Sequence, residues 1–109
     1  MDNMSWADKY RVAGETWCDA EAAASLLEYL KSVVMAQKQT ELGDLPVNRQ
    51  EQTVKASQFW EDYVRSCITA RKEANLAKVK VEEIRIGFSE WQSSQANERA
   101  EFKMTMGGG

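Results

Sequence analysis

The sequence contains no histidine, which removes the commonest general base, the commonest metal ligand and every serine–histidine or cysteine–histidine nucleophile pair. Its two cysteines, Cys18 and Cys67, are too few for a disulfide framework. The chain also lacks a glycine-rich phosphate loop, a dinucleotide-binding motif and a CxxC pair. We therefore expect a protein that is not an enzyme and that holds no metal or cofactor.

Long apolar runs are absent as well. No stretch approaches the ~18 apolar residues that a membrane span needs, and no positively charged start precedes an apolar core. The net charge of −3 is mild, which argues against a wholly electrostatic nucleic-acid binder. With 109 residues, the chain is expected to form a single cytoplasmic domain without a membrane partner.

Helix breakers are scarce, because the chain has one proline, Pro46, and only six glycines. Ser5 can cap a first helix, with Asp8 three residues later able to bond back. Gly43 in a left-handed cap, followed by Pro46, would end that helix. Asn48 can then cap a second one. The sequence predicts an all-α antiparallel hairpin: a helix over about 5–42, a turn over 43–47, a helix over about 48–104 and a flexible end over 105–109.

Both helices carry a heptad seam, meaning apolar residues spaced alternately by three and four. The seam of the first helix contains one charge, Lys31, whose side chain we expect to extend into solvent rather than to fix the register. The first seam comprises Trp6, Tyr10, Ala13, Trp17, Ala20, Ala24, Leu27, Lys31 and Val34. The second comprises Trp60, Tyr63, Cys67, Ala70, Ala74, Ala77, Val81, Ile84, Phe88 and Trp91.

A turn near residue 47 pairs seam residues whose numbers add to 94, such as Trp6 with Phe88 and Trp17 with Ala77. Small residues then meet at the centre and aromatics at the two ends, although a shift by one heptad stays open. The four tryptophans could instead line a ligand pocket, but their seam positions favour core packing. Cys67 on the seam is expected to be an inert core thiol, and Cys18 to be partly exposed.

Several apolar residues lie off the seams, and a lone hairpin cannot cover them. Residues from about 92 to 106 also have no partner in the first helix. We therefore predict a homodimer that forms an antiparallel four-helix bundle; the alternative is that the end of the chain folds back as a third helix. The candidate oligomer contacts are Leu26, Leu30, Val33, Phe59, Ile68, Val79 and Ile86.

Charge is unevenly distributed: residues 1–44 have a net charge of −4 and residues 64–86 a net charge of +3. A basic flank on the second helix could bind phosphate backbone or a partner protein, or simply pair with acids such as Glu15, Asp19 and Glu28, which is the favoured interpretation. The acidic first helix could act as a decoy for a DNA-binding surface, but a solvated helix face explains it more simply. The basic flank consists of Arg65, Arg71, Lys72, Lys78 and Arg85.

Four segments carry a resemblance to a known group of proteins: GETWCDAEAAASLLE at 14–28, ELGDLPV at 41–47, FSEWQS at 88–93 and NERAE at 97–101. On these segments the chain resembles small helical proteins encoded by tailed bacteriophages and prophages. The resemblance extends over most of the chain and implies a phage or prophage origin and a role in the infected bacterial cytoplasm. No established activity comes with it, and it supplies no catalytic residues.

These observations together favour a small protein-interaction module that binds itself and an unidentified phage or host protein. One alternative is an accessory factor for replication or recombination that uses the basic flank on single-stranded DNA. A second alternative is an inhibitor of a host nuclease or defence complex. A structural role in the virion also stays open.

Overall fold

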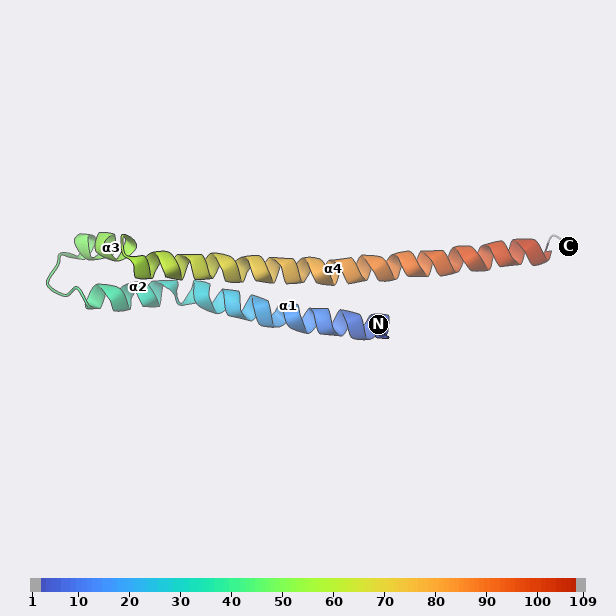
Figure 1. The fold of residues 1–109 in the computed structure, drawn as a ribbon, viewed down its shortest axis with the longest axis horizontal. Coiled ribbons are helices and arrows are strands. Elements are labelled where there is room, and N and C mark those ends of the chain that lie inside the picture. The colour runs from blue at the N-terminus through green and yellow to red at the C-terminus, as the bar shows by residue number, and fades with distance from the viewer. Residues whose placement is uncertain (1–2, 108–109) are drawn as a thin grey trace.

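A computed structural model describes residues 3–107 as four helices and, over that range, no strand. The helices are α1 (Trp6–Tyr29), α2 (Lys31–Thr40), α3 (Val47–Lys55) and α4 (Gln58–Gly107). Together α1 and α2 run antiparallel to α3 and α4, which makes a rod of 92 × 21 × 20 Å (Figure 1). The all-α antiparallel hairpin predicted from the sequence is therefore confirmed. None of the described helices combines the length and the apolar character that crossing a membrane requires.

Close contacts between α1 and α4 show which residues of the two helices lie opposite each other, that is, the register of the hairpin. The rings of Trp6 and Phe88 lie 6.0 Å apart between centroids, and Lys78 Nζ lies 5.8 Å from the centroid of the Trp17 ring. The residue numbers of these pairs add to 94 and 95. Both contacts agree with the register derived from a turn near residue 47, without a heptad shift.

The core of the hairpin is thin. Among the described residues six apolar side chains are buried, and five of them lie on the two heptad seams. Val54 in α3 is the exception, and its burial was not predicted from the sequence. The buried residues are Ala13, Ala24, Val54, Trp60, Ala74 and Val81.

The first long helix is interrupted at Leu30, where the sequence predicted continuity. One turn earlier, the Tyr63 hydroxyl donates a hydrogen bond of 2.5 Å to the Leu27 carbonyl oxygen. A side-chain donor on a helical carbonyl competes with the backbone ladder, which is a recognised cause of helix kinks. Burial raises the pKa of the Tyr63 phenol, which keeps the donor protonated.

The second long helix is interrupted at Ala56 and Ser57, because Ser57 closes one helix and opens the next. Its hydroxyl donates to the Val54 carbonyl oxygen at 2.6 Å and accepts from the Trp60 amide at 3.2 Å. A serine that accepts from the third amide of a helix is a typical N-cap. Capping by Ser57 therefore separates α3 from α4.

The turn differs from its prediction in two details. No described glycine has a positive φ, so Gly43 does not form the left-handed cap expected of it. The Gln50 side chain closes the turn instead, because its Nε2 donates to the carbonyl oxygens of Leu42 and Leu45 at 3.1 and 2.8 Å. The helix after the turn also begins earlier than predicted, because Pro46, not Asn48, is the N-cap of α3. At the first start, Ser5 caps α1 as predicted, accepting from the Asp8 amide at 3.1 Å.

The end of α4 has no partner helix within residues 3–107. Residues 92–107, which we call the overhang, continue α4 past the start of α1 and do not fold back as a third helix (Figure 1). Residues 105–107 are helical where the sequence predicted flexibility, and residues 108–109 lie outside the described range. The overhang therefore exposes apolar side chains such as Phe102 and Met104.

Candidate functional site

The basic flank is tied into the hairpin at Arg71. Its Nε and Nη2 donate to the two carboxylate oxygens of Glu28 at 3.0 and 2.7 Å, and its Nη1 pairs with Glu21. These hydrogen bonds raise the pKa of Arg71 and lower the pKa of Glu28. Arg71 therefore bridges α4 and α1 and has both carboxylates as close partners. Glu28 was among the acids predicted from the sequence to pair with the basic flank, whereas Glu21 was not.

Three other members of the basic flank also have neighbours within the chain. Arg65 pairs with Glu61 at 2.9 Å, Arg85 pairs with Glu82, and Lys78 lies over the Trp17 ring. Lys72 is exposed and forms no ion pair within residues 3–107. The flank thus contains one bridge between helices and two local pairs, and this arrangement matches the acid-pairing interpretation better than a phosphate-binding strip.

Replacing Arg71 with alanine is expected to lower the thermal midpoint at pH 7, because Glu21 and Glu28 then lose their partner on α4. Glu28 has a folded pKa below its ordinary value of 4.5, so its contribution to stability is present above pH 4.5 and is lost as the pH falls through the folded value. The variant should therefore lose less stability than the natural protein between pH 7 and pH 3. Circular-dichroism melting at both pH values measures this difference.

The matched control for this substitution is Arg65→Ala, which removes an exposed pair within one turn of α4. Exposed pairs of this kind contribute little to stability, so its melting curve should stay close to that of the natural protein. If Arg71→Ala and Arg65→Ala lowered the thermal midpoint equally, the bridge between α1 and α4 would contribute no more to stability than an exposed pair within one helix.

The tryptophans differ in their surroundings. Trp60 is buried, Trp6 and Trp17 are half-buried, and Trp91 is 46% exposed. Trp91 continues the heptad seam in sequence. Its ring stacks on that of Phe88, with centroids 6.0 Å apart, at a level of α4 that lies beyond the first residue of α1. The seam contact predicted for Trp91 is therefore wrong, because α1 supplies no residue opposite it.

The other seam aromatics of this end are also incompletely covered. Tyr10 is 50% exposed and Phe88 is 36% exposed, so both pack at the edge of the seam rather than inside it. Lys31 is exposed, with its Nζ 5.9 Å from the centroid of the Trp60 ring, which agrees with a side chain that extends into solvent. Cys18 is exposed, Cys67 is half-buried, and both are free thiols.

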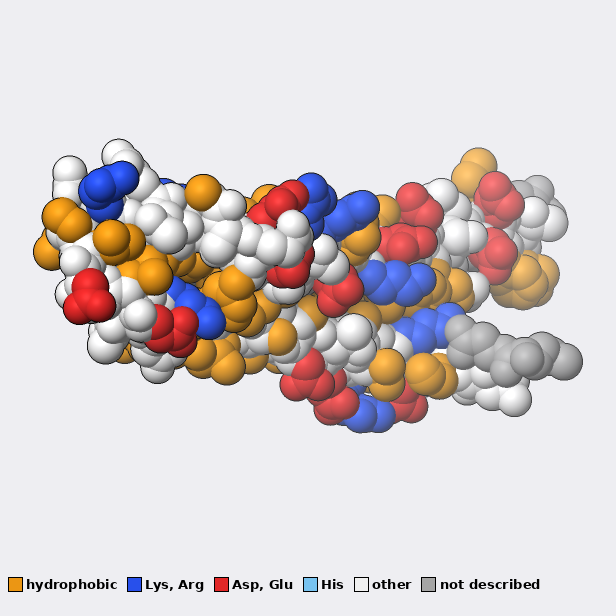
Figure 2. Space-filling view, turned by 60° about the vertical axis from the view of Figure 1, so that its left-hand side comes forward, with side chains coloured by type: hydrophobic (Ala, Val, Ile, Leu, Met, Phe, Trp, Pro, Cys, Tyr) orange, Lys and Arg blue, Asp and Glu red, His pale blue; other side chains and the backbone are white. Residues whose placement is uncertain are grey.

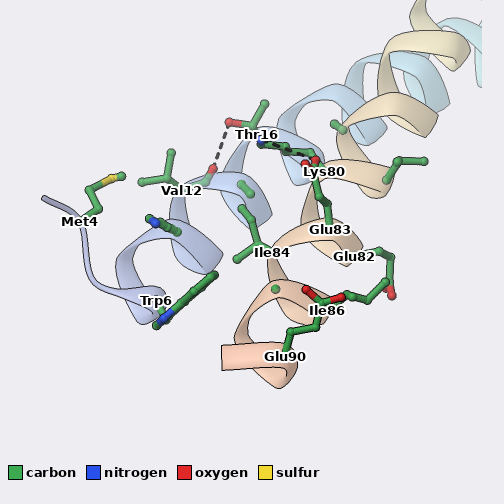
Figure 3. Close-up of a pocket in the computed structure, with 15 residues that line it drawn as sticks. Met4, Trp6, Val12, Thr16, Lys80, Glu82, Glu83, Ile84, Ile86 and Glu90 are labelled. Atoms are coloured by element: carbon green, nitrogen blue, oxygen red, sulfur yellow. Dashed lines mark hydrogen bonds and ion pairs between the residues drawn. The ribbon is translucent and has the colours of Figure 1, made fainter. Parts of the chain in front are cut away.

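An open groove of about 910 Å³ lies at the start of α1, between α1 and α4 (Figure 3). Trp6, Val12 and Ile84 contribute apolar lining, and Lys80 and Glu83 on its rim pair with each other at 3.6 Å. The backbone of Gly87 also lines it, and a Cβ there would lie 3.2 Å from the Trp6 ring. The described residues include no group of three histidine, cysteine, aspartate or glutamate side chains placed to hold a metal ion.

Apolar side chains reach the surface over much of the hairpin, between charged ones (Figure 2). On α1 and α2, Leu26 is 57% exposed, Val33 is 44% exposed and Leu30 is half-buried. On α4 the exposed apolar residues include all four candidate oligomer contacts. They also include Leu76, which was not predicted from the sequence. The candidates on α4 are Phe59, Ile68, Val79 and Ile86.

Heptad positions assign these residues to sides of the hairpin. With Trp17 and Trp60 at position a, Arg71 and its partners Glu21 and Glu28 all occupy position e, and they meet on one side. In an antiparallel pair, positions g and c of both helices then lie on the opposite side. That side, which we call the g side, carries Leu26, Leu30 and Val33 from the first helices, and Phe59 and Leu76 from α4.

The remaining candidates do not share the g side. Ile68 occupies position b, and Val79 and Ile86 occupy position f, where both are exposed and also border the groove at Trp6. The seven candidate oligomer contacts are therefore divided among three directions. Leu76, at position c, could have been found from its spacing relative to Phe59.

Comparison with protein-family models, with curated proteins and with solved structures found no match to this chain.

Proposed function

We propose that the protein is a non-enzymatic interaction module of phage or prophage type, which self-associates and binds a partner protein through the surface of the resulting helical bundle in the bacterial cytoplasm. The observation that supports this function is the imbalance between core and surface. Six apolar side chains are buried among the described residues, whereas large apolar side chains remain exposed along every helix. Such exposure on a small soluble chain is typical of an interaction surface.

The charge arrangement supports a protein partner over single-stranded DNA. Arg71, Arg65 and Arg85 each have a carboxylate partner in the same chain, so binding phosphate would first require breaking these pairs. Nucleic-acid affinity rises with the number of phosphates that lysine and arginine neutralise. We therefore favour a partner protein that binds this surface through apolar contacts.

Light scattering coupled to size exclusion tests the self-association. The natural chain should have a mass of twice 12.4 kDa, and its melting midpoint should rise with protein concentration, because dissociation accompanies unfolding. A mass of 12.4 kDa at every concentration would contradict the proposal. Retention on labelled single-stranded DNA at physiological salt would instead support the replication or recombination alternative.

A further inference from the structure

One stretch of the g side is apolar without interruption. Ala23, Leu26, Leu30 and Val33, which we call the apolar stripe, follow one another at alternate g and c positions with spacings of three, four and three. Three of them are exposed and Leu30 is half-buried. Polar residues bound the stripe on both sides: Thr16 and Asp19 before it, Gln37 and Thr40 after it.

We propose that a second copy of this chain covers the apolar stripe, antiparallel to the first, so that Leu26 of each copy packs against Leu30 of the other. This inference rests on the proposed self-association and specifies its register. The two-fold axis would pass near residue 28, perpendicular to the helices. Such an interface is isologous, because the same residues contribute from both copies.

The apolar stripe is self-complementary in one register. When residues whose numbers add to 56 face each other, Leu26 meets Leu30 and Ala23 meets Val33, while the polar residues beyond them face polar residues. A shift by one heptad in one direction places Leu30 opposite Asp19. A shift in the other direction places Leu26 opposite Gln37. Only the central register brings all four apolar residues together.

The α4 helix independently supports the same axis. In the observed hairpin register, residue 28 lies opposite about residue 66 of α4. Phe59 lies seven residues before that point and Leu76 ten residues after it, and both are exposed on the g side. The proposed axis therefore brings Phe59 of one copy to within about one helical turn of Leu76 of the other. Asp62 and Glu73 would also approach each other there, so we place the closest packing between the two first helices.

A parallel arrangement of the two copies fits less well. A two-fold axis along the rod would place the first helix of one copy over α4 of the other, in the register of the hairpin itself. Val33 would then face Asp62, and Asp19 would face Leu76, because these residue numbers add to 95. Both contacts are unfavourable, because each desolvates a carboxylate against an apolar side chain.

The available surface is large enough for a stable dimer. A standard interface buries about 800 Å² on each partner. That is roughly a tenth of the 8448 Å² that the chain exposes, and the long side of the rod measures 92 × 21 Å. A second copy placed in this register would overlap residues of about 12–44, so it would reach the edge of the groove and leave Trp6 and the overhang uncovered.

Cysteine cross-linking tests the register directly. In a Cys18→Ser, Cys67→Ala background, the double variant Ala23→Cys, Val33→Cys should form a disulfide-linked dimer on mild oxidation, seen on a non-reducing gel. The two new thiols of one chain are ten residues apart, or about 15 Å along a helix, too far for a bridge within the chain. Ala23→Cys alone and Val33→Cys alone serve as matched controls and should stay mostly uncross-linked, because like residues of the two copies are also about 15 Å apart.

The outcomes separate this register from self-association itself. Efficient cross-linking of either single variant would overturn the antiparallel register. Absence of cross-linking in the double variant, together with a dimeric mass by light scattering, would also overturn the register while leaving the proposed function standing. A monomeric mass for the cysteine-free background and for the natural chain would overturn both.

Discussion

Replacing Trp60 with alanine should lower the free energy of unfolding by about 3–5 kcal/mol, the range for removing a large aromatic side chain from a core. Trp60 is 8% exposed and is the largest of the six buried residues. Its ring stacks on Tyr63 with centroids 5.7 Å apart and an interplanar angle of 16°. Because the core is thin, few neighbouring side chains can close the space that the ring leaves. Urea denaturation followed by circular dichroism measures the loss at a fixed protein concentration.

The control for Trp60→Ala is the same chemical change at Trp91. This ring is 46% exposed, so its removal should cost about 1 kcal/mol or less. A loss from Trp91→Ala as large as that from Trp60→Ala would show that another chain covers the start of the overhang in solution. A small loss from both would contradict the assignment of Trp60 to the core.

Enlarging the small centre of the hairpin is the second change with a large expected effect. Ala24 has no exposed surface, and Ala74 on α4 is also buried. The two helices approach closely because alanines face each other there. Leucine at position 24 would force the helices apart or strain its neighbours, at a cost of about 1–3 kcal/mol. Thermal melting of Ala24→Leu should show this loss together with retained helical signal.

Two residues away, Ala22 provides a matched control, because it lies on the same helix and is exposed. Alanine and leucine are both strong helix formers, so Ala22→Leu should change stability by less than about 0.5 kcal/mol. If Ala24→Leu melted together with Ala22→Leu, the close approach of α1 and α4 would be contradicted.

The periodicity of the sequence was sufficient to predict the hairpin and to favour its register, with a shift by one heptad left open. Large side chains at the ends of both seams and small ones at the centre match in one alignment, and the Trp6–Phe88 contact follows from it. The interruptions at Leu30 and Ser57 were not predictable in this way. The first coincides with a hydrogen bond from Tyr63, which lies 36 positions from Leu27 in sequence. The second depends on one hydroxyl that serves two helix ends.

The errors at the candidate surfaces also have physical reasons. Trp91 fits the heptad pattern, but its partner in the predicted register would be residue 3, which precedes the start of α1. Gly43 is the residue type expected in a left-handed cap. The side chain of Gln50, from the helix after the turn, donates to the carbonyl oxygens of Leu42 and Leu45 instead. Glu21 was not among the acids predicted to pair with the basic flank. The guanidinium of Arg71 has enough donors to bind both Glu21 and Glu28, which lie one heptad apart.

The overhang has a consequence for how far the proposed dimer can reach. Residues 92–107 add about 24 Å of helix beyond the start of α1, at 1.5 Å per residue. In the proposed antiparallel dimer, the two overhangs would point outward from opposite ends of the bundle and would make it a bivalent ligand with two separate helical arms. Two binding sites on a target would be engaged together only at a matching separation, and the second contact would benefit from a high effective concentration. Inserting one heptad into the overhang would lengthen each arm by about 10 Å without touching the apolar stripe.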